Sequence, residues 1–236
     1  GAAPLRPGAR RAATALAQGP GACWQPAGGG FFEDLTRQLE EQDTHLVPTP
    51  EQQRQRDQLI GTLKPLFERH TGGVLHMFGS CENGLWMNGS DVDACLVLRR
   101  CMQRPSWLTK LRLMQSLVER ERLGTALVVS AARVPVAKLQ NTEGAELCDV
   151  SVNNVAALEN SRFVKALVQL DPRVASLGRF IKHWALRRRI NNRSEGTLST
   201  YTLILQLFYF LQTRDPPVLP RVVDLLTVPL DFWRER

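Results

Sequence analysis

Three features that would assign the 236-residue sequence to other protein classes are missing from it. No apolar run approaches the roughly 20 residues that a membrane-spanning helix needs. The longest, Leu203 to Leu211, is interrupted by Gln206, so we expect a buried helix there and no membrane partner. The five cysteines are odd in number and form no CxxC pair, which favours reduced thiols in an intracellular protein over a disulfide framework or a zinc site. No internal repeat is evident.

Acidic residues are missing from the first 30 positions, which are rich in Ala, Gly, Pro and Arg. Such a segment cannot bury enough apolar surface to fold alone, so we expect residues 1–30 to be a disordered linker or tail. The alternative is part of an organelle transit peptide, but those are usually also rich in Ser. Because the sequence begins with Gly, we expect a processed chain or a piece of a longer protein.

The charge balance is basic, with a formal net charge of +7. A positive balance favours polyanionic partners such as nucleic acid, nucleotides or anionic membrane. Hydrophobic residues make up 43% and charged residues 22% of the sequence, which are ordinary values for a globular protein.

Helix signals are clear near the start of the folded part. Phe31 to Glu41 predicts a short amphipathic helix. Thr49, Pro50 and Gln52 then have the pattern of a capping box with proline at the first helical position. The apolar face of this second helix is expected to contain Leu59, Ile60, Leu63, Leu66 and Phe67, and Gly72-Gly73 to end it.

The middle of the chain predicts strands and its second half predicts helices. Strands are expected at Val74–Phe78, Asp91–Leu98, within Ala126–Lys138 and at Glu146–Val152, with a helix at Trp107–Glu121. Further helices are expected after Asp171-Pro172 and at Leu198–Gln212. We therefore predict an α+β fold: a mixed sheet with helices on one face in a catalytic domain, residues 31–160, and a helical domain, residues 161–236.

Asp91 and Asp93 are separated by one residue on a predicted strand, so both carboxylates should point to the same face. Like charges so placed need compensation, and a divalent metal such as Mg²⁺ would provide it. The alternative is a solvated polar edge, but the apolar run Ala94–Leu98 indicates a buried strand. Asp149 offers a third carboxylate on another strand, and three acids from two strands could hold two metal ions for phosphoryl transfer.

Gly79-Ser80 precedes the Asp pair by a short loop. Glycine allows the backbone to approach a phosphate closely, and the Ser hydroxyl with the next backbone N–H groups could hold it. The dipeptide is common in turns, so its significance depends on the Asp pair that follows.

Phe78-Gly79-Ser80 followed after ten residues by Asp91-Val92-Asp93 resembles the signature of the DNA polymerase β-like nucleotidyltransferases, with Asp149 as the third acid. The segments 148–154, 158–161, 182–185 and 196–201 resemble the terminal uridylyltransferases and the related cytoplasmic poly(A) polymerases. Together the resemblance covers about residues 50–220.

This resemblance implies a role for each matching residue. Asp91, Asp93 and Asp149 would be the catalytic metal ligands, with Mg²⁺ or Mn²⁺ as the cofactor. The implied nucleotide-binding residues are Gly79, Ser80, Asn160, Ser161, Lys182, Thr200 and Tyr201, with Lys182 and Thr200 on the phosphates, Tyr201 stacked on the base, and Asn160 and Ser161 at the ribose or base edge. Arg133 and Lys138 are candidates for RNA binding.

Each of these residues also has a purely structural interpretation. Lys182 could lie on a solvated basic face, Tyr201 could be a core aromatic, and Asn160 and Ser161 could cap the helix that follows. The sequence also departs from the resemblance at Leu186, where the family often has a second basic residue. The resemblance also implies a loop that reads the incoming base, which we expect to be missing from this sequence, and a helical domain that we expect to be incomplete.

The resulting expectation is a monomeric enzyme that adds uridylate from UTP to RNA 3′ ends without a template. The alternatives are a poly(A) polymerase that uses ATP, a small-molecule nucleotidyltransferase, and an inactive RNA- or nucleotide-binding fragment. We expect a cytoplasmic location, with mitochondrial or nuclear locations as alternatives.

Overall fold

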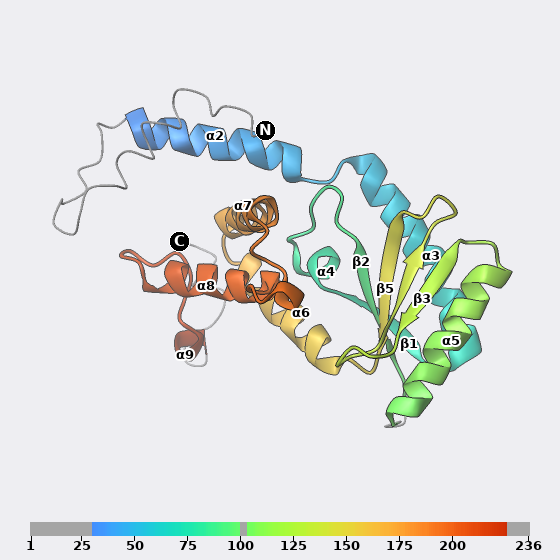
Figure 1. Ribbon diagram of the computed structural model, residues 1–236. Coiled ribbons are helices and arrows are strands. Elements are labelled where there is room, and N and C mark those ends of the chain that lie inside the picture. Colours follow the sequence, from blue (N-terminus) through green and yellow to red (C-terminus); the bar gives the residue numbers. More distant parts are fainter. Residues whose placement is uncertain (1–29, 100–102, 226–236) are drawn as a thin grey trace. The chain divides into compact units, whose positions relative to one another are not determined.

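The computed structural model describes residues 30–99 and 103–225 of the chain. The expected tail at 1–30, apart from Gly30, lies outside these residues, as do Cys23, Cys101 and the end of the expected helical domain. The described elements are α2 (Gly30–Leu46), α3 (Pro50–Thr71), β1 (Val74–Phe78), α4 (Ser80–Asn83), β2 (Val92–Val97), α5 (Arg104–Arg120), β3 (Thr125–Val129), β4 (Val136–Gln140), β5 (Glu146–Val152), α6 (Val155–Val168), α7 (Pro172–Arg188), a 3₁₀ turn (Arg193–Glu195), α8 (Thr200–Thr213) and α9 (Val222–Leu225) (Figure 1).

The chain divides into two compact units after Gln38. The smaller unit includes the first part of α2, where Phe31 and Leu35 are exposed. The helix expected at Phe31–Glu41 is present and extends to Leu46. Its first apolar residues are not buried. The larger unit begins at Leu39 and contains the sheet and all later helices, and the structure below is that of this unit.

The start of α3 confirms the predicted capping box. The Thr49 hydroxyl accepts a hydrogen bond from the Gln52 backbone N–H at 3.2 Å, and the Gln52 side chain accepts one from the Thr49 N–H at 2.9 Å. Pro50 occupies the first turn, where a missing N–H costs nothing. At the other end Gly72 adopts the left-handed conformation and ends the helix.

The described strands form one five-stranded mixed sheet in the order β1-β2-β5-β4-β3. β2 and β5 are parallel and adjacent, and the other neighbouring pairs are antiparallel. Asp93 pairs with Asp149 across β2 and β5, and Asp149 pairs with Lys138 across β5 and β4. Paired residues point to the same face of a sheet, so these three side chains form one row.

The opposite face of the sheet packs on α3 and α5 and forms the first hydrophobic core. Phe67 of α3 and Leu111 of α5 are fully buried against strand residues such as Ala94, Leu139 and Val150. On the acidic face, the start of α6 lies over β2, where the Asn154 N–H donates to the Cys95 sulfur.

A second core joins α6, α7 and α8. Val164, Val174, Ile204 and Phe208 belong to it. Leu85, from the loop between α4 and β2, is only 1% exposed and is part of this helical core. The loop that leads to Asp91 is therefore anchored in the helical part of the molecule.

The helical part of the chain begins earlier than the residue 161 expected from the sequence. β5 ends at Val152, and α6 begins at Val155 after the N-cap residue Asn154, where apolar residues recur at helical spacing. Asn160 and Ser161 consequently lie inside α6, and the interpretation that they cap a following helix is wrong. The division expected between residues 160 and 161 also falls within this helix and stays a prediction.

We expect Thr49→Ala to lower the free energy of unfolding by about 1 kcal/mol, because it removes the side-chain cap of α3. Thr62→Ala is the matched control, since the Thr62 hydroxyl bonds only to a carbonyl one turn earlier in the middle of α3. This control should change the free energy by less than about 0.5 kcal/mol. Urea denaturation measures both, and equal effects of the two variants would contradict the role of the capping box.

Candidate active site

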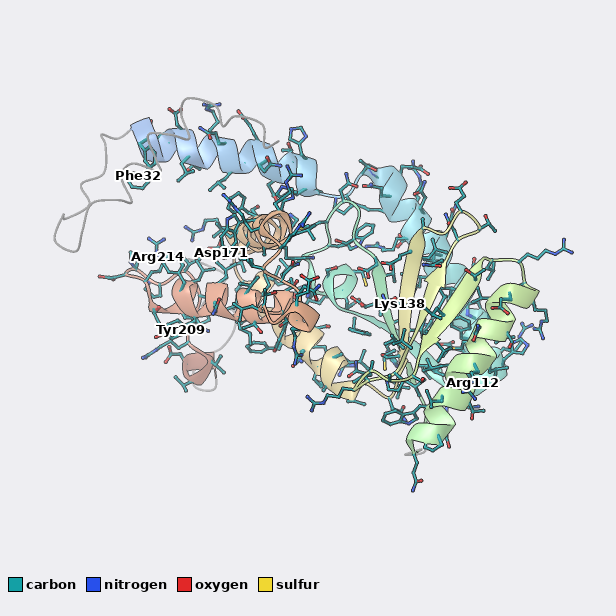
Figure 2. All side chains as sticks on the ribbon, in the orientation of Figure 1. Phe32, Arg112, Lys138, Asp171, Tyr209 and Arg214 are labelled. Carbon is teal, nitrogen blue, oxygen red and sulfur yellow. The ribbon has the colours of Figure 1, made fainter. Side chains whose placement is uncertain are left out.

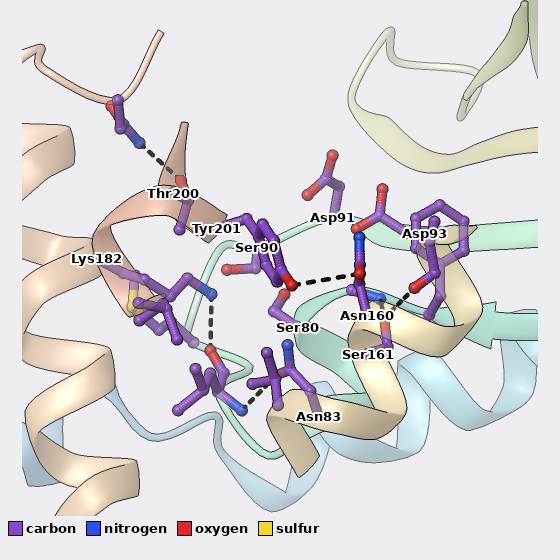
Figure 3. A pocket seen from close by; sticks show the side chains of 18 of the residues that line it. Ser80, Asn83, Ser90, Asp91, Asp93, Asn160, Ser161, Lys182, Thr200 and Tyr201 are labelled. Atoms are coloured by element: carbon purple, nitrogen blue, oxygen red, sulfur yellow. Dashed lines mark hydrogen bonds between the residues drawn. The ribbon is translucent and has the colours of Figure 1, made fainter. Parts of the chain in front are cut away.

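The acidic row at the start of β2 is the centre of the candidate site. Asp91 immediately precedes β2 and is exposed, whereas Asp93 is partly buried within the strand. Figure 3 shows the carboxylates of Asp91 and Asp93 close to each other at the edge of the cavity. The prediction that β2 brings this pair to one place is thus in agreement with the structure.

Charge repulsion and burial act together on Asp93. Burial raises the pKa of Asp93 to about 7, and the nearby carboxylates of Asp91 and Asp149 add to the rise. Lys182 and Lys138 oppose this effect without cancelling it. The site therefore has more negative charge than its own cations neutralise, as expected of a place built for a cation.

Asp149 is held by a lysine. Its Oδ2 lies 3.0 Å from Lys138 Nζ, and this bond raises the pKa of Lys138. The pKa of Asp149 is nevertheless raised, because burial outweighs the attraction of Lys138. Lys138, labelled on the sheet in Figure 2, thus belongs to the acidic row, and its role as an RNA contact stays a prediction.

The turn after β1 has a backbone conformation that requires glycine. Gly79 has a φ of +67° and ψ of −149°, a conformation open essentially to glycine alone, and Ser80 begins the short helix α4. The Gly79 N–H donates to the Ser161 hydroxyl at 2.8 Å, and that hydroxyl donates to the Ala157 carbonyl. Ser161 therefore holds this turn against α6 with both of its hydrogen-bonding functions occupied.

A second contact fixes the same turn. Lys165 Nζ lies 2.7 Å from Glu82 Oε1, which joins α6 to α4. The two contacts come from successive turns of α6, so the helix positions the loop as a unit.

Lys182 extends from α7 toward the acids. Its ammonium group donates to the Leu85 carbonyl at 2.7 Å (Figure 3). Burial lowers the pKa of Lys182 to about 8, although Asp91 and Asp93 favour its charged form. An ammonium with few water contacts and spare donors is well suited to bind a phosphate.

The remaining predicted residues meet at the start of α8. The Tyr201 hydroxyl donates to Asn160 Oδ1 at 3.3 Å, and the Asn191 amide donates to Thr200 Oγ1 at 3.4 Å. Figure 3 shows the Tyr201 ring standing between Lys182 and Asn160. Its flat face is available to a planar ring within the cavity.

A cavity of about 470 Å³ connects these residues within the larger unit. Of the predicted site residues, those that line it are Gly79, Ser80, Asp91, Asp93, Asn160, Ser161, Lys182, Thr200 and Tyr201. Asp149 and Lys138 lie beside it on the sheet and do not line it. Arg133 lies between β3 and β4, is exposed, and is not brought to the cavity.

Several lining residues were not predicted. Asn83 and Ser90 lie in the segment between Gly79 and Asp91, and Asn191 follows α7. Ser90 could have been suspected from its position beside Asp91, but no local pattern indicates Asn191. Leu186, where a second basic residue was expected from the resemblance, also lines the cavity and offers no charge to a phosphate.

We expect Gly79→Ala to be destabilising, because a Cβ there would overlap the Asp93 carboxylate. Gly89→Ala is the matched control: Gly89 also has a positive φ of +76°, but a Cβ there would have no neighbour within 4 Å. Gly79→Ala should cost about 1–3 kcal/mol more than the control in urea denaturation, since the acid must move. Equal losses would show that strain alone, and not the contact with Asp93, requires glycine at this position.

Comparison with known proteins agrees with this geometry. The sequence profile described as "Poly(A) RNA polymerase, mitochondrial-like, central palm domain" matches residues 35–169. Poly(A) RNA polymerase cid11 of Schizosaccharomyces pombe is 32% identical over 198 residues, which are 82% of this chain and 41% of the relative. Terminal uridylyltransferase 4 of Homo sapiens is 32% identical over 190 residues, 76% of this chain and 11% of the relative.

The fold of the chain is also similar to that of solved structures. A solved structure of Cid1 in complex with the UTP analog UMPNPP matches with a TM-score of 0.71 and 28% identity, covering 84% of this chain and 60% of that one. The chain spans less than half the length of the curated relatives described above. The resemblance seen in the sequence is confirmed, and the chain belongs to the family of mitochondrial-like poly(A) RNA polymerase palm domains.

Proposed function

We propose that the protein transfers nucleotides from a nucleoside triphosphate to the 3′ end of RNA, with UTP as the preferred substrate. The observation that carries the proposal is one cavity with carboxylates on one wall and Lys182 and Tyr201 on the other. Those groups suit the three parts of the donor: a cation with the triphosphate, the phosphate charge, and the base. In the reaction the RNA 3′-hydroxyl bonds to the α-phosphate and pyrophosphate leaves.

The carboxylates fit Mg²⁺ as the cation. Mg²⁺ typically binds one or two protein carboxylates together with substrate phosphates and water, which Asp91 and Asp93 can provide. Among the residues that the structure describes, no three acidic, His or Cys side chains are already gathered around one point. Asp149 would join as a third ligand once its bond to Lys138 is exchanged. When bound, the cation would neutralise phosphate charge and lower the pKa of the attacking hydroxyl.

The protein's own groups then position the donor. The Gly79-Ser80 turn, held by Ser161, offers backbone N–H groups and a hydroxyl to the phosphates. Lys182 adds a positive charge from the opposite side, and Tyr201 offers a stacking surface for the base. Lys138, released from Asp149, would be free to meet the phosphate backbone of the RNA.

Two donors are consistent with this cavity. Support for UTP comes from the Cid1 structure with a UTP analog and from the similarity to terminal uridylyltransferase 4. ATP is the second candidate because cid11, which matches more of this chain, is named a poly(A) RNA polymerase. Stacking on Tyr201 accepts either base, so the choice must come from contacts at the base edge.

The first test is extension of a labelled short RNA with each of the four nucleoside triphosphates in Mg²⁺. We expect uridylate addition, and Asp93→Asn should reduce the rate by more than roughly a hundredfold because it removes a principal electrostatic group. Asp57→Asn is the control, since Asp57 is an exposed acid on α3 paired with Arg56. It should leave the rate unchanged.

Each alternative has its own outcome in this assay. Adenylate addition would show that ATP, not UTP, is the preferred donor and would leave the proposed mechanism of nucleotidyl transfer unchanged. Donor binding without extension would identify a nucleotide-binding fragment, and extension that survives in Asp93→Asn would contradict the role of the acidic row.

The two shifted pKa values predict a bell-shaped pH dependence for binding of the Mg²⁺–nucleotide complex. Asp93 loses its charge as the pH falls through about 7, which weakens cation binding. Lys182 loses its charge as the pH rises through about 8, which weakens phosphate binding. Affinity measured by calorimetry across this range should therefore be highest between these values.

Lys182→Arg tests the alkaline limb of this profile. Arginine remains charged at every pH used, so the affinity of this variant should no longer fall above pH 8. A flat profile in the unaltered protein, or an alkaline limb that persists in Lys182→Arg, would contradict the assignment.

A further inference from the structure

An ion pair outside the lining of the cavity connects the end of α2 to α7. Arg179 Nε lies 2.7 Å from Asp43 Oδ1, and its Nη2 lies 2.6 Å from Asp43 Oδ2. The Ser176 hydroxyl donates to the same carboxylate at 2.8 Å. The Arg179 and Asp43 side chains are only 13% and 15% exposed, so water screens this pair weakly. The Arg179 guanidinium holds the pKa of Asp43 below its usual value.

The same face of α7 contacts the loop that leads to Asp91. Gly178 approaches Leu85 so closely that a methyl group at Gly178 would overlap the Leu85 side chain. Lys182, one turn after Arg179, donates to the Leu85 carbonyl. Residues three and four apart share one face of a helix, so Lys182 lies beside both Gly178 and Arg179. Arg179 also donates to the Gly84 carbonyl at 3.5 Å, so all three residues contact this loop.

The other side of the loop is held by the last residue of α2 and the first turn of α3. The Asn88 N–H donates to the Leu46 carbonyl at 2.9 Å, and the side chains of Asn88 and Gln52 are hydrogen-bonded. The end of α2 thus contacts two elements: it bonds to α7 through Asp43 and to the loop before Asp91 through Leu46. Both contacts lie within the larger unit.

We propose that Asp43 is a positioning residue, which holds α7 against the 84–91 loop through Arg179 and Ser176 and so sets the place of the Lys182 ammonium for the nucleotide phosphates. This role deepens the proposed function and rests on it. Asp43 does not line the cavity, so it acts on the bound nucleotide only through α7. Without the pair, α7 keeps its packing against α6 and α8 but loses its polar attachment to the end of α2.

Asp43→Asn tests this role, since it keeps the shape of the side chain and removes its charge. We expect the dissociation constant for Mg²⁺–UTP, measured by calorimetry on the 236-residue chain, to rise roughly tenfold, less than the ~100-fold that a 1 Å misplacement can cost. Amide hydrogen exchange in residues 84–91 should become faster. Asp43→Glu, which retains the charged carboxylate, should restore most of the affinity.

Asp171→Asn is the matched control. Asp171 also pairs with an arginine of α7 through both carboxylate oxygens, but Arg173 is exposed and the pair lies at the far end of the helix. Asparagine retains the N-cap there, so affinity should change by less than about twofold. Ser176→Ala removes one hydrogen bond and leaves the ion pair, and should weaken binding roughly threefold.

The outcomes separate a positioning role from a merely structural one. A fall in melting temperature with an unchanged dissociation constant in Asp43→Asn would overturn the inference, as would equal weakening by Asp171→Asn. If Asp43→Asn does not fold, an unchanged affinity in Ser176→Ala overturns it. Nucleotide binding without RNA extension in the unaltered chain would reject the proposed function and leave the positioning role standing, whereas no nucleotide binding would overturn both.

Discussion

Mutual repulsion of the carboxylates at the start of β2 is the constraint to which the rest of the site responds. Parallel pairing of β2 with β5 places Asp93 directly beside Asp149, and Asp91 adds a third charge. Burial prevents water from relieving this repulsion, as the raised pKa of Asp93 shows. Two lysines from different elements, Lys138 from β4 and Lys182 from α7, partly neutralise the charge of these carboxylates. An arrangement of this kind costs stability unless a ligand completes it, which is typical of a functional site.

The helical part and the sheet are joined by packing as well as by charge. Leu85 is buried among residues of α6 and α8, although it precedes β2 by only a short loop. Ser161 and Lys165 of α6 hold the Gly79 turn at the other end of that segment. The segment from Gly79 to Asp91 is therefore fixed at both ends by helices, so a shift of those helices would move the phosphate turn and the first acid together.

Local signals in the sequence predicted the parts of the structure that local interactions determine. The Thr49 capping box involves residues three apart, and its geometry follows from that spacing. The side-by-side placement of Asp91 and Asp93 follows from strand alternation in the same way. Even Asp149 could be placed on a second strand, but its pairing with Asp93 depends on a contact between distant segments, and no spacing in the sequence specifies that.

Contacts between distant segments account for what the sequence did not reveal. Asp43 and Arg179 are 136 residues apart, and nothing near either residue indicates the other. Lys138 was a candidate RNA contact, and its bond to Asp149 became visible only with the strand order. Ser161 was predicted to lie at the ribose or base edge, and its bonds to the Gly79 N–H and the Ala157 carbonyl became visible only with the fold. In each case the sequence shows a residue that can form the bond, but it does not show which distant residue is the partner.

Charge balance also bears on the order in which substrates can bind. A triphosphate alone would carry several negative charges toward Asp91 and Asp93, and the cavity offers Lys182 as the cation among its lining residues. Because Leu186 is uncharged, one lysine must compensate repulsion from both acids and phosphates. A divalent cation alone would meet favourable charge, but Mg²⁺ surrenders its water reluctantly to two carboxylates. The nucleotide and its cation should therefore enter as one complex, in which each offsets the charge that would exclude the other.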